Sequence, residues 1–140
     1  MLATKSAGRV VLVNLTKTVL VDLCYLTLWM GAKDVETSVN LVVNEKGLEQ
    51  ALENPDPQRA DVPRQIVAIQ AFDHQLLQHC PLDVVVNIAS MQEMDPPVVA
   101  GYFEYLRVVA RKRDLLFYCC NRLEKKLPDG TVTKFAYWPC

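Results

Sequence analysis

Glycine is scarce in this sequence, and its few copies form no phosphate-binding pattern. There are five glycines among 140 residues, and no Gly-x-Gly pattern occurs anywhere in the chain. A P-loop enzyme is excluded because no Gly-Lys-Ser or Gly-Lys-Thr motif is present. An α/β-hydrolase is a poor alternative, since the chain has no Gly-x-Ser-x-Gly motif for a nucleophile elbow.

The chain also lacks an excess of charge of either sign. Fifteen basic and sixteen acidic side chains leave a formal net charge of -1. This balance gives no positive field for nucleic acids or for anionic membrane surfaces. We therefore expect neither nucleic acid nor a membrane as a partner.

No long apolar run is free of charge. The most apolar segment, residues 10–30, is interrupted by Asn14, Lys17 and Asp22. A charged side chain near the middle of a membrane span costs ~2.5–3.5 kcal/mol on insertion scales. No cleavage-site pattern of a secretory signal is present. We therefore expect this segment to belong to a soluble protein.

Metal-binding and disulfide patterns are missing as well. The five cysteines are an odd number, with no Cys-x-x-Cys pair and no histidines at zinc-finger spacing. They are typical of reduced thiols in a cytoplasmic protein, and we expect no metal site. Because 140 residues suffice for one hydrophobic core and not for two ordinary domains, we predict a single domain over residues 1–140.

What the sequence does contain is one stretch around which the others can be arranged. Residues 84–88 are nearly all apolar and mostly β-branched, which is typical of a strand buried on both faces of a parallel sheet. The polar residues 90–93 follow, and Asp95 with two prolines then begins a helix. We therefore predict a central strand, a polar elbow and a helix. Alternatively, Gln92 and Glu93 merely solvate a turn.

Three further apolar runs have the same character. They are residues 9–15, 65–71 and 115–119. Helices are expected from Thr16 or Thr18 to Gly31, at 45–53, in a short segment after Asp73, and from Pro96 to Ala110. An edge strand is expected at 39–43 and a terminal strand at 131–138. A surface connection is expected up to Arg64. Strands that alternate with helices predict an α/β fold with a parallel, doubly wound sheet.

Polar or aromatic side chains follow each of the four main strands. They are Asn14, then Phe72 with Asp73, then residues 90–93, and finally Asn121 with Arg122. Right-handed crossovers place the carboxyl ends of parallel strands on one edge of a sheet. Ligands of open α/β sheets bind beyond these ends. We therefore expect the four groups to converge on a ligand site.

One stretch also resembles a known family. Residues 87–94, Asn-Ile-Ala-Ser-Met-Gln-Glu-Met, look like the Asn-x-x-Ser-Met-Gln-Glu-Met strand end of the sugar O-methyltransferases, a family of class I S-adenosylmethionine-dependent enzymes. Similar features are Tyr102-Phe103, Phe117-Tyr118 with Asn121-Arg122, the aromatic stretch 135–139, and residues 10–26, which resemble the family's second strand and the helix after it. The resemblance covers most of the chain except residues 32–64. It implies a Rossmann-like parallel sheet with flanking helices.

The resemblance implies a cofactor site for S-adenosyl-L-methionine. Asn14 and Leu15 would face its ribose. Phe72 would lie against the adenine, and Asp73 would accept a hydrogen bond from the adenine amino group. Ser90 and Met91 would line the methionyl side.

It also implies the reaction, which is in-line transfer of a methyl group to a hydroxyl of a sugar or glycoside acceptor. One proton must leave that hydroxyl, and Glu93 is the best-placed base in the motif. A carboxylate needs burial to raise its pKa toward neutrality. His74 and His79 are alternative bases, although a lone histidine beside a short helix is more often a surface residue.

Two departures from the family's pattern affect the expected activity. The family's second strand normally ends in a carboxylate that holds the ribose diol, and this chain has Asn14 there, whose amide forms weaker hydrogen bonds. The family's first strand and Gly-rich loop have no counterpart in the sequence. We therefore interpret the chain as a relative truncated at the N-terminus, with impaired cofactor binding.

A second hypothesis belongs to another class of function. The chain would be a non-catalytic interaction domain with a degenerate methyltransferase fold. A partner or a second copy would cover an unfilled groove of the sheet and the helix face at residues 98–110, because an exposed seam of buried-type strand should not remain monomeric. This hypothesis predicts a homo-oligomer.

Overall fold

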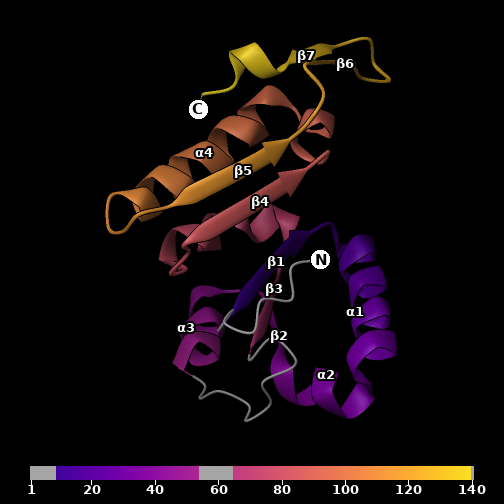
Figure 1. Ribbon diagram of the computed structural model, residues 1–140, viewed down its shortest axis with the longest axis vertical. Helices are drawn as coiled ribbons and strands as arrows, with labels where there is room; N and C mark the ends of the chain where they lie inside the picture. The colour runs from indigo at the N-terminus through magenta and orange to yellow at the C-terminus, as the bar shows by residue number, and fades with distance from the viewer. Residues whose placement is uncertain (1–8, 54–64, 140) are drawn as a thin grey trace. The chain divides into compact units, whose positions relative to one another are not determined.

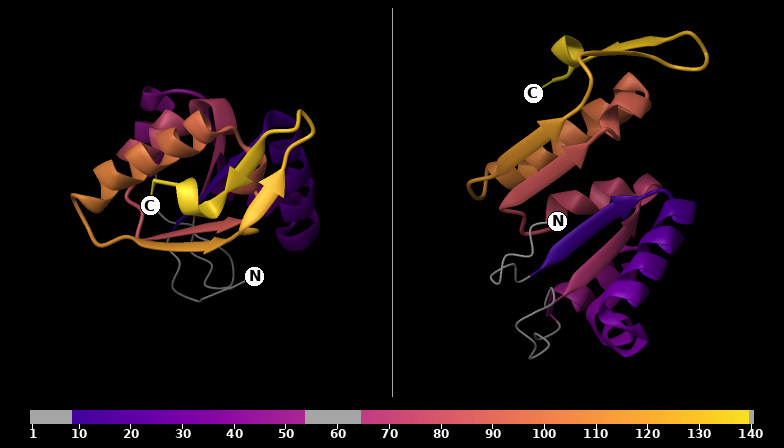
Figure 2. Two further views of the ribbon diagram at one scale, coloured as in Figure 1. Left: turned by 90° about the horizontal axis from the view of Figure 1, so that it is seen from above. Right: turned by 45° about the vertical axis from the view of Figure 1, so that its right-hand side comes forward.

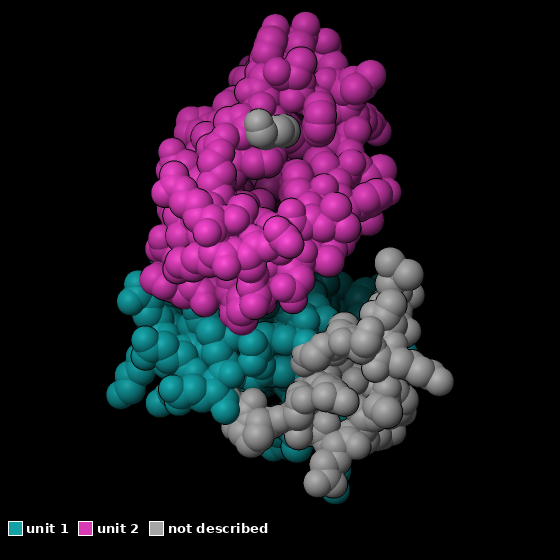
Figure 3. All heavy atoms as spheres, turned by 60° about the vertical axis from the view of Figure 1, so that its left-hand side comes forward, with its two compact units in different colours: residues 1–76 teal, residues 77–140 magenta. Residues whose placement is uncertain are grey.

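The computed structural model describes residues 9–53 and 65–139. The chain divides into two compact units, Met1–Leu76 and Leu77–Cys140 (Figure 3). The elements up to the end of the third strand are β1 (Val10–Asn14), α1 (Thr16–Met30), α2 (Ala32–Ser38), β2 (Val39–Val42), α3 (Glu45–Glu53) and β3 (Ile66–Gln70). The 3-10 helix η1 (Ala71–His79) follows β3.

The elements after η1 belong to the second unit. They are β4 (Val84–Ile88), the 3-10 helix η2 (Met91–Glu93), α4 (Pro96–Ala110), β5 (Leu116–Cys120), β6 (Glu124–Lys126), β7 (Val132–Lys134) and the 3-10 helix η3 (Phe135–Tyr137). The predicted boundaries of the main strands and helices agree with these elements to within one or two residues.

The sheet of the first unit has three parallel strands in the order β1-β3-β2. The central strand β3 forms the core, because Ile66, Val67, Ala68 and Ile69 are each at most 1% exposed. As predicted, β2 is an edge strand. The first crossover runs from β1 to β2 and the second returns from β2 to β3. Right-handed connections therefore place α1 and α3 on opposite sides of the sheet, where Figure 1 shows them.

Helix α1 is attached to its sheet by few side chains. Val19 is buried at 4% exposure and Leu23 and Leu26 are half-buried, whereas Leu20 and Leu28 are exposed at 60% and 83%. The helix ends at Gly31, whose φ of 91° is readily adopted only by a residue without a side chain. The predicted stop is confirmed. Some of the apolar side chains expected to face the core, Leu20 and Leu28 among them, are exposed instead.

The sheet of the second unit consists of β4 and β5, which pair in parallel from Val84↔Leu116 to Ile88↔Cys120. Helix α4 connects them and covers one face of the pair (Figures 1 and 2). Its buried side chains are Val99, Tyr102, Phe103, Leu106 and Val109. The rings of Phe103 and Phe117 meet edge to face with centroids 5.4 Å apart. This contact attaches the helix to β5.

The expectation that residues 84–88 are buried on both faces was wrong. In β4 every second residue is exposed, and the fractions are 56% for Val84, 58% for Val86 and 64% for Ile88. Only the face toward α4 is covered, because α4 is the one long helix described in this unit. In addition, β4 pairs only with β5 among the described strands, so it is an edge strand and not a central one.

A hairpin follows β5. Strands β6 and β7 pair antiparallel, and Gly130, with φ of 92°, lies in the predicted turn between them. The expected terminal strand at 131–138 is too long, since only Val132–Lys134 are extended and η3 follows. No pattern in the sequence indicates β6, whose three residues are all charged.

The α/β class and the parallel pairing of the main strands are confirmed. The single predicted sheet is replaced by parallel sheets of three and two strands and a separate hairpin. The expected surface connection at residues 54–64 and the polar lead at 1–8 lie outside the described residues. No helix in the described ranges is long and apolar enough to cross a membrane.

Candidate functional site

The polar elbow after β4 begins with a sharp change of backbone direction. Ala89 has a φ of 59°, in the left-handed region that residues with a side chain adopt uncommonly. Its amide still donates to the carbonyl of Cys120 at 2.8 Å, which extends the pairing with β5 by one residue. The turn leaves Ser90 exposed and starts η2 immediately afterward.

Two asparagines connect the carboxyl ends of β4 and β5. The carboxamide of Asn121 donates to Oδ1 of Asn87 at 2.7 Å, and the carboxamide of Asn87 donates to the hydroxyl of Ser90. The backbone amide of Gln92 in turn donates to Oδ1 of Asn121 at 3.3 Å. Asn87 therefore links the end of β4 to the end of β5 through Asn121 and to the elbow through Ser90.

Gln92 fixes the elbow from inside. It is 6% exposed, and its Oε1 accepts a hydrogen bond from the backbone amide of Arg122 at 2.7 Å. The hydroxyl of Thr133 donates to the Gln92 carbonyl at 3.2 Å, so β7 also contacts the elbow. The alternative in which Gln92 merely solvates a turn is wrong, because the side chain is buried and hydrogen-bonded.

Glu93 is an exposed carboxylate with a cationic partner. Its Oε1 accepts hydrogen bonds from the ammonium of Lys125 and, at 3.2 Å, from Nε2 of Gln92. The hydrogen bond from Lys125 is the main cause of a pKa below the ordinary glutamate value. A general base requires a pKa raised toward neutrality, and the observed direction is the opposite one. Glu93 in this setting is a weak proton acceptor.

The two remaining elbow residues differ in their access to a ligand. Ser90 is exposed, and its hydroxyl oxygen already accepts a hydrogen bond from Asn87. Met91 is 3% exposed and belongs to the core of the second unit. A ligand at this elbow would therefore meet Ser90 and Glu93 first.

The carboxyl end of β1 carries a carboxylate that the sequence pattern did not reveal. Nδ2 of Asn14 donates to Oδ2 of Asp22 at 3.0 Å, and Oδ1 of Asn14 accepts from the amide of Leu15 at 3.0 Å. Asp22 lies eight positions after the strand end, on α1, where no motif pointed to it. The strand end thus has a carboxylate from the helix in addition to its own amide. Leu15 beside it is 67% exposed.

The carboxyl end of β3 lies beside that of β1, because Asn14 and Gln70 are paired in the sheet. Phe72 and Asp73 follow Gln70 in η1. Phe72 is 70% exposed, so its ring is available for stacking. Asp73 is 8% exposed, and its buried Oδ2 has no hydrogen-bond partner among the described residues. A buried acceptor in this state lowers stability by roughly 1–3 kcal/mol, which a donor from a ligand or a water molecule would offset.

Both alternative bases lie in η1. His74 is half-buried and His79 is exposed. The described residues contain no cluster of His, Cys, Asp or Glu that could hold a metal ion.

No family model matches this chain, and neither do the curated proteins and solved structures compared with it. The resemblance to the sugar O-methyltransferases therefore depends on the motif residues themselves. In the first unit Asn14 is paired with Gln70, which precedes Phe72 and Asp73 in the chain. In the second unit Gln92 contacts Asn121. Convergence of all four strand ends on one rim stays a prediction.

Proposed function

We propose that this chain is an S-adenosylmethionine-dependent O-methyltransferase-like protein with a Rossmann-like fold and a sugar hydroxyl as acceptor. The observation that carries this proposal is Asp73. It is a buried carboxylate directly after a central parallel strand, and one of its oxygens has no described partner. This is the edge of a sheet at which α/β proteins bind their ligands.

The residues around Asp73 fit the nucleoside part of the cofactor. An unsatisfied carboxylate oxygen suits the amino group of adenine, and the exposed ring of Phe72 suits stacking against the base. For the ribose diol, the Asp22 carboxylate next to Asn14 offers acceptor oxygens. Asp22 compensates in part for the amide at the strand end, since charge-assisted hydrogen bonds are roughly twice as strong as neutral ones.

The residues of the second unit fit the acceptor side less well. When bound, the cofactor supplies a sulfonium methyl group for transfer to a hydroxyl. Glu93 can accept a hydrogen bond from that hydroxyl, but its lowered pKa makes removal of the proton unfavourable. Ser90 can orient the same hydroxyl. We therefore propose slow methyl transfer at best.

Cofactor binding is also expected to be weak. Close approach of the backbone to a ligand ordinarily uses glycines, and the chain has no Gly-x-Gly loop. The described cysteines form no disulfide with one another, and this supports a reducing cytoplasmic location. A cytoplasm contains both the cofactor and soluble sugar acceptors.

Isothermal titration calorimetry with S-adenosylmethionine tests the proposal. We expect binding with a dissociation constant above roughly 100 μM, lost in Asp73→Ala and weakened in Asp73→Asn. Glu93→Gln is the control, because it should leave cofactor binding unchanged. Circular dichroism checks that each variant is folded. Absence of any binding up to millimolar cofactor would contradict the proposal, and micromolar binding would contradict the predicted impairment.

A specific observation also favours the second function, a non-catalytic interaction domain. Parallel sheets are normally covered on both faces, yet the face of β4 and β5 opposite α4 is apolar and exposed. An apolar surface of this kind marks a site of interaction with another protein. Pull-down experiments that compare the intact chain with a chain bearing charged substitutions on this face would test whether the face binds another protein.

A further inference from the structure

The exposed side of the second unit's parallel sheet is a continuous apolar surface. We call it the outer face, and its members are Val84, Val86, Ile88, Leu116, Tyr118 and Cys120. Their exposed fractions include 58% for Val86, 64% for Leu116 and 54% for Tyr118. Together they expose on the order of 500 Å² of side chain, the upper end of what a monomeric protein leaves in one patch.

The two rows of side chains on the outer face are in register. Val84 pairs with Leu116, Val86 with Tyr118 and Ile88 with Cys120. In a strand, alternate side chains point to opposite faces, so all six members lie on the side away from α4. The residues between them, such as Phe117, face α4 instead.

We infer that the outer face binds the outer face of a second copy of this chain. This inference rests on the interaction function proposed above and names the partner. The face carries no charged side chain, so two copies can approach without like-charge repulsion or desolvation of an ion. Its only hydroxyl, on Tyr118, lies at the tip of a large side chain and can reach the polar rim of a contact.

The size of the outer face agrees with a dimer of modest affinity. Two such faces in contact bury on the order of 1,000 Å², which is near the lower limit for a specific protein interface. Packing of two sheets face to face, about 10 Å apart, is the arrangement of a β-sandwich core. A two-fold axis lying in the interface makes the contact self-complementary and closed, so it stops at two copies.

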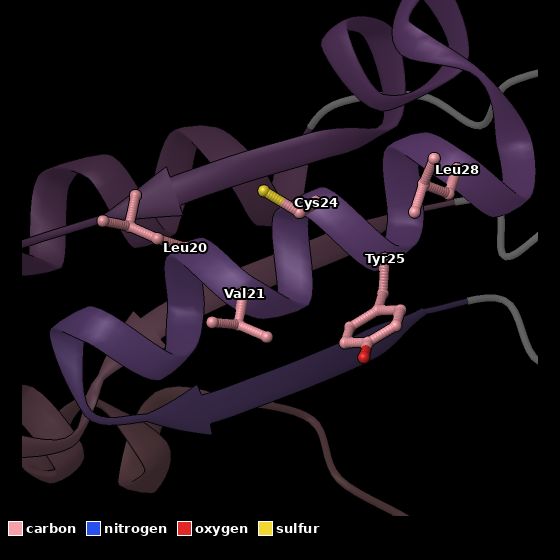
Figure 4. Close-up of a pocket in the computed structure, with 5 residues that line it drawn as sticks. All are labelled: Leu20, Val21, Cys24, Tyr25 and Leu28. Atoms are coloured by element: carbon pink, nitrogen blue, oxygen red, sulfur yellow. The ribbon is translucent and has the colours of Figure 1, made fainter.

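Helix α1 offers the competing apolar surface. Five of its side chains, Leu20, Val21, Cys24, Tyr25 and Leu28, line an open hollow of about 390 Å³ on the helix (Figure 4). These side chains all come from one helix, whereas the outer face is formed by two paired strands.

Two exposed thiols let the unmodified protein report which surface is used. Cys120 belongs to the outer face and Cys24 to the hollow on α1, and both are free and exposed. Sedimentation velocity from micromolar to millimolar protein measures the dimer. Alkylation by iodoacetamide, followed by peptide mass spectrometry, measures the rate at each thiol. We expect dimer formation with slower alkylation of Cys120 and an unchanged rate at Cys24.

Matched lysine substitutions complete the experiment. Val86→Lys places one ammonium from each copy in the same contact, which should raise the dimer dissociation constant by more than about 100-fold. Leu28→Lys is the control on α1 and should leave the dimer constant unchanged. A dimer that protects Cys24 and dissociates in Leu28→Lys would overturn the inference while keeping an interaction function. The inference would be overturned if the protein were a folded monomer at all concentrations with both thiols reactive. If the pull-down failed as well, the interaction function would also be overturned.

Discussion

Asn121 and Asn87 join the carboxyl ends of the two parallel strands of the second unit through a side-chain hydrogen bond of 2.7 Å. Asn87 also donates to the Ser90 hydroxyl and accepts from the Met91 amide at 3.4 Å. One carboxamide thereby fixes both the strand pair and the elbow that follows it. The residue type at position 87 thus has a structural reason besides any contact with a ligand.

Asn87→Ala should destabilise the second unit. The substitution leaves the amide of Met91 without an acceptor and leaves the carboxamide of Asn121 with only the sulfur of Cys119, and a lost partner of this kind costs about 1–3 kcal/mol. Urea denaturation followed by circular dichroism measures the free energy of unfolding. Ser90→Ala removes only the hydroxyl acceptor and should cost less than half as much. Equal effects of the two substitutions would show that the link between Asn87 and Asn121 contributes little.

Lys125→Met should raise the pKa of Glu93. The hydrogen bond from Lys125 is the largest cause of the lowered value, and the hydrogen bond from Gln92 and the charge of Arg122 remain in the variant. The pKa should therefore rise, because desolvation, which raises it, is no longer opposed by the hydrogen bond from Lys125. NMR titration of the side-chain carboxyl carbon measures it. Lys134→Met, which removes the partner of Glu124 at 3.2 Å, is the control and should not move the pKa of Glu93.

The same ion pair predicts how stability depends on pH. A carboxylate whose folded-state pKa is lowered stabilises the fold at pH values above its unfolded-state pKa. This stabilisation is lost as the pH falls through the folded-state pKa of Glu93. The acid-induced loss of stability should therefore be smaller in Lys125→Met than in the unmodified chain. An identical pH profile would contradict a stabilising pair.

Phe103→Ala should be among the most damaging substitutions in α4. Phe103 is 6% exposed and contacts Phe117 edge to face, and replacing a buried phenylalanine by alanine costs about 3–5 kcal/mol. Val98→Ala on the same helix is the control, because Val98 is 39% exposed and its loss should cost less than about 1 kcal/mol. Thermal unfolding measures both. Similar losses would mean that α4 does not pack as described.

Local patterns in the sequence predicted the elements of this fold well. Apolar runs identified β1, β3, β4 and β5, and Gly31 and the prolines after Asp95 marked a helix end and a helix start. These signals arise from the residues of the element itself. They are present whatever the rest of the chain does.

Features that depend on distant residues could not be predicted in the same way. A run such as residues 84–88 is compatible with one or two covered faces, and the number of helices that pack on it decides the matter. The three charged residues of β6 form a strand only because β7 pairs with them. Intrinsic propensity gives little weight to such a segment.

The candidate site, too, could be predicted from the sequence where it depends on local patterns and not where it depends on distant residues. The motif located the elbow, and the register of β1 and β3 places Asn14 beside the end of β3 as expected. The burial of Asp73 and Met91, the carboxylate of Asp22 and the lysine beside Glu93 depend on packing and side-chain position. For this reason the sequence could not show whether burial raises the pKa of Glu93, and in the structure the hydrogen bond from Lys125 lowers it.

The strand order β1-β3-β2 also determines when the first unit can fold during synthesis. The middle strand is the last of the three to leave the ribosome, and neither β1 nor β2 pairs with the other. Strands β1 and β2 therefore have no pairing partner until β3 is synthesised. The ends of the long segment between β1 and β3 must also come together, at an entropic cost, before their contacts stabilise the unit. A nascent chain halted before Ile66 would have no sheet at all, and it would depend on chaperones to keep those strands from aggregating.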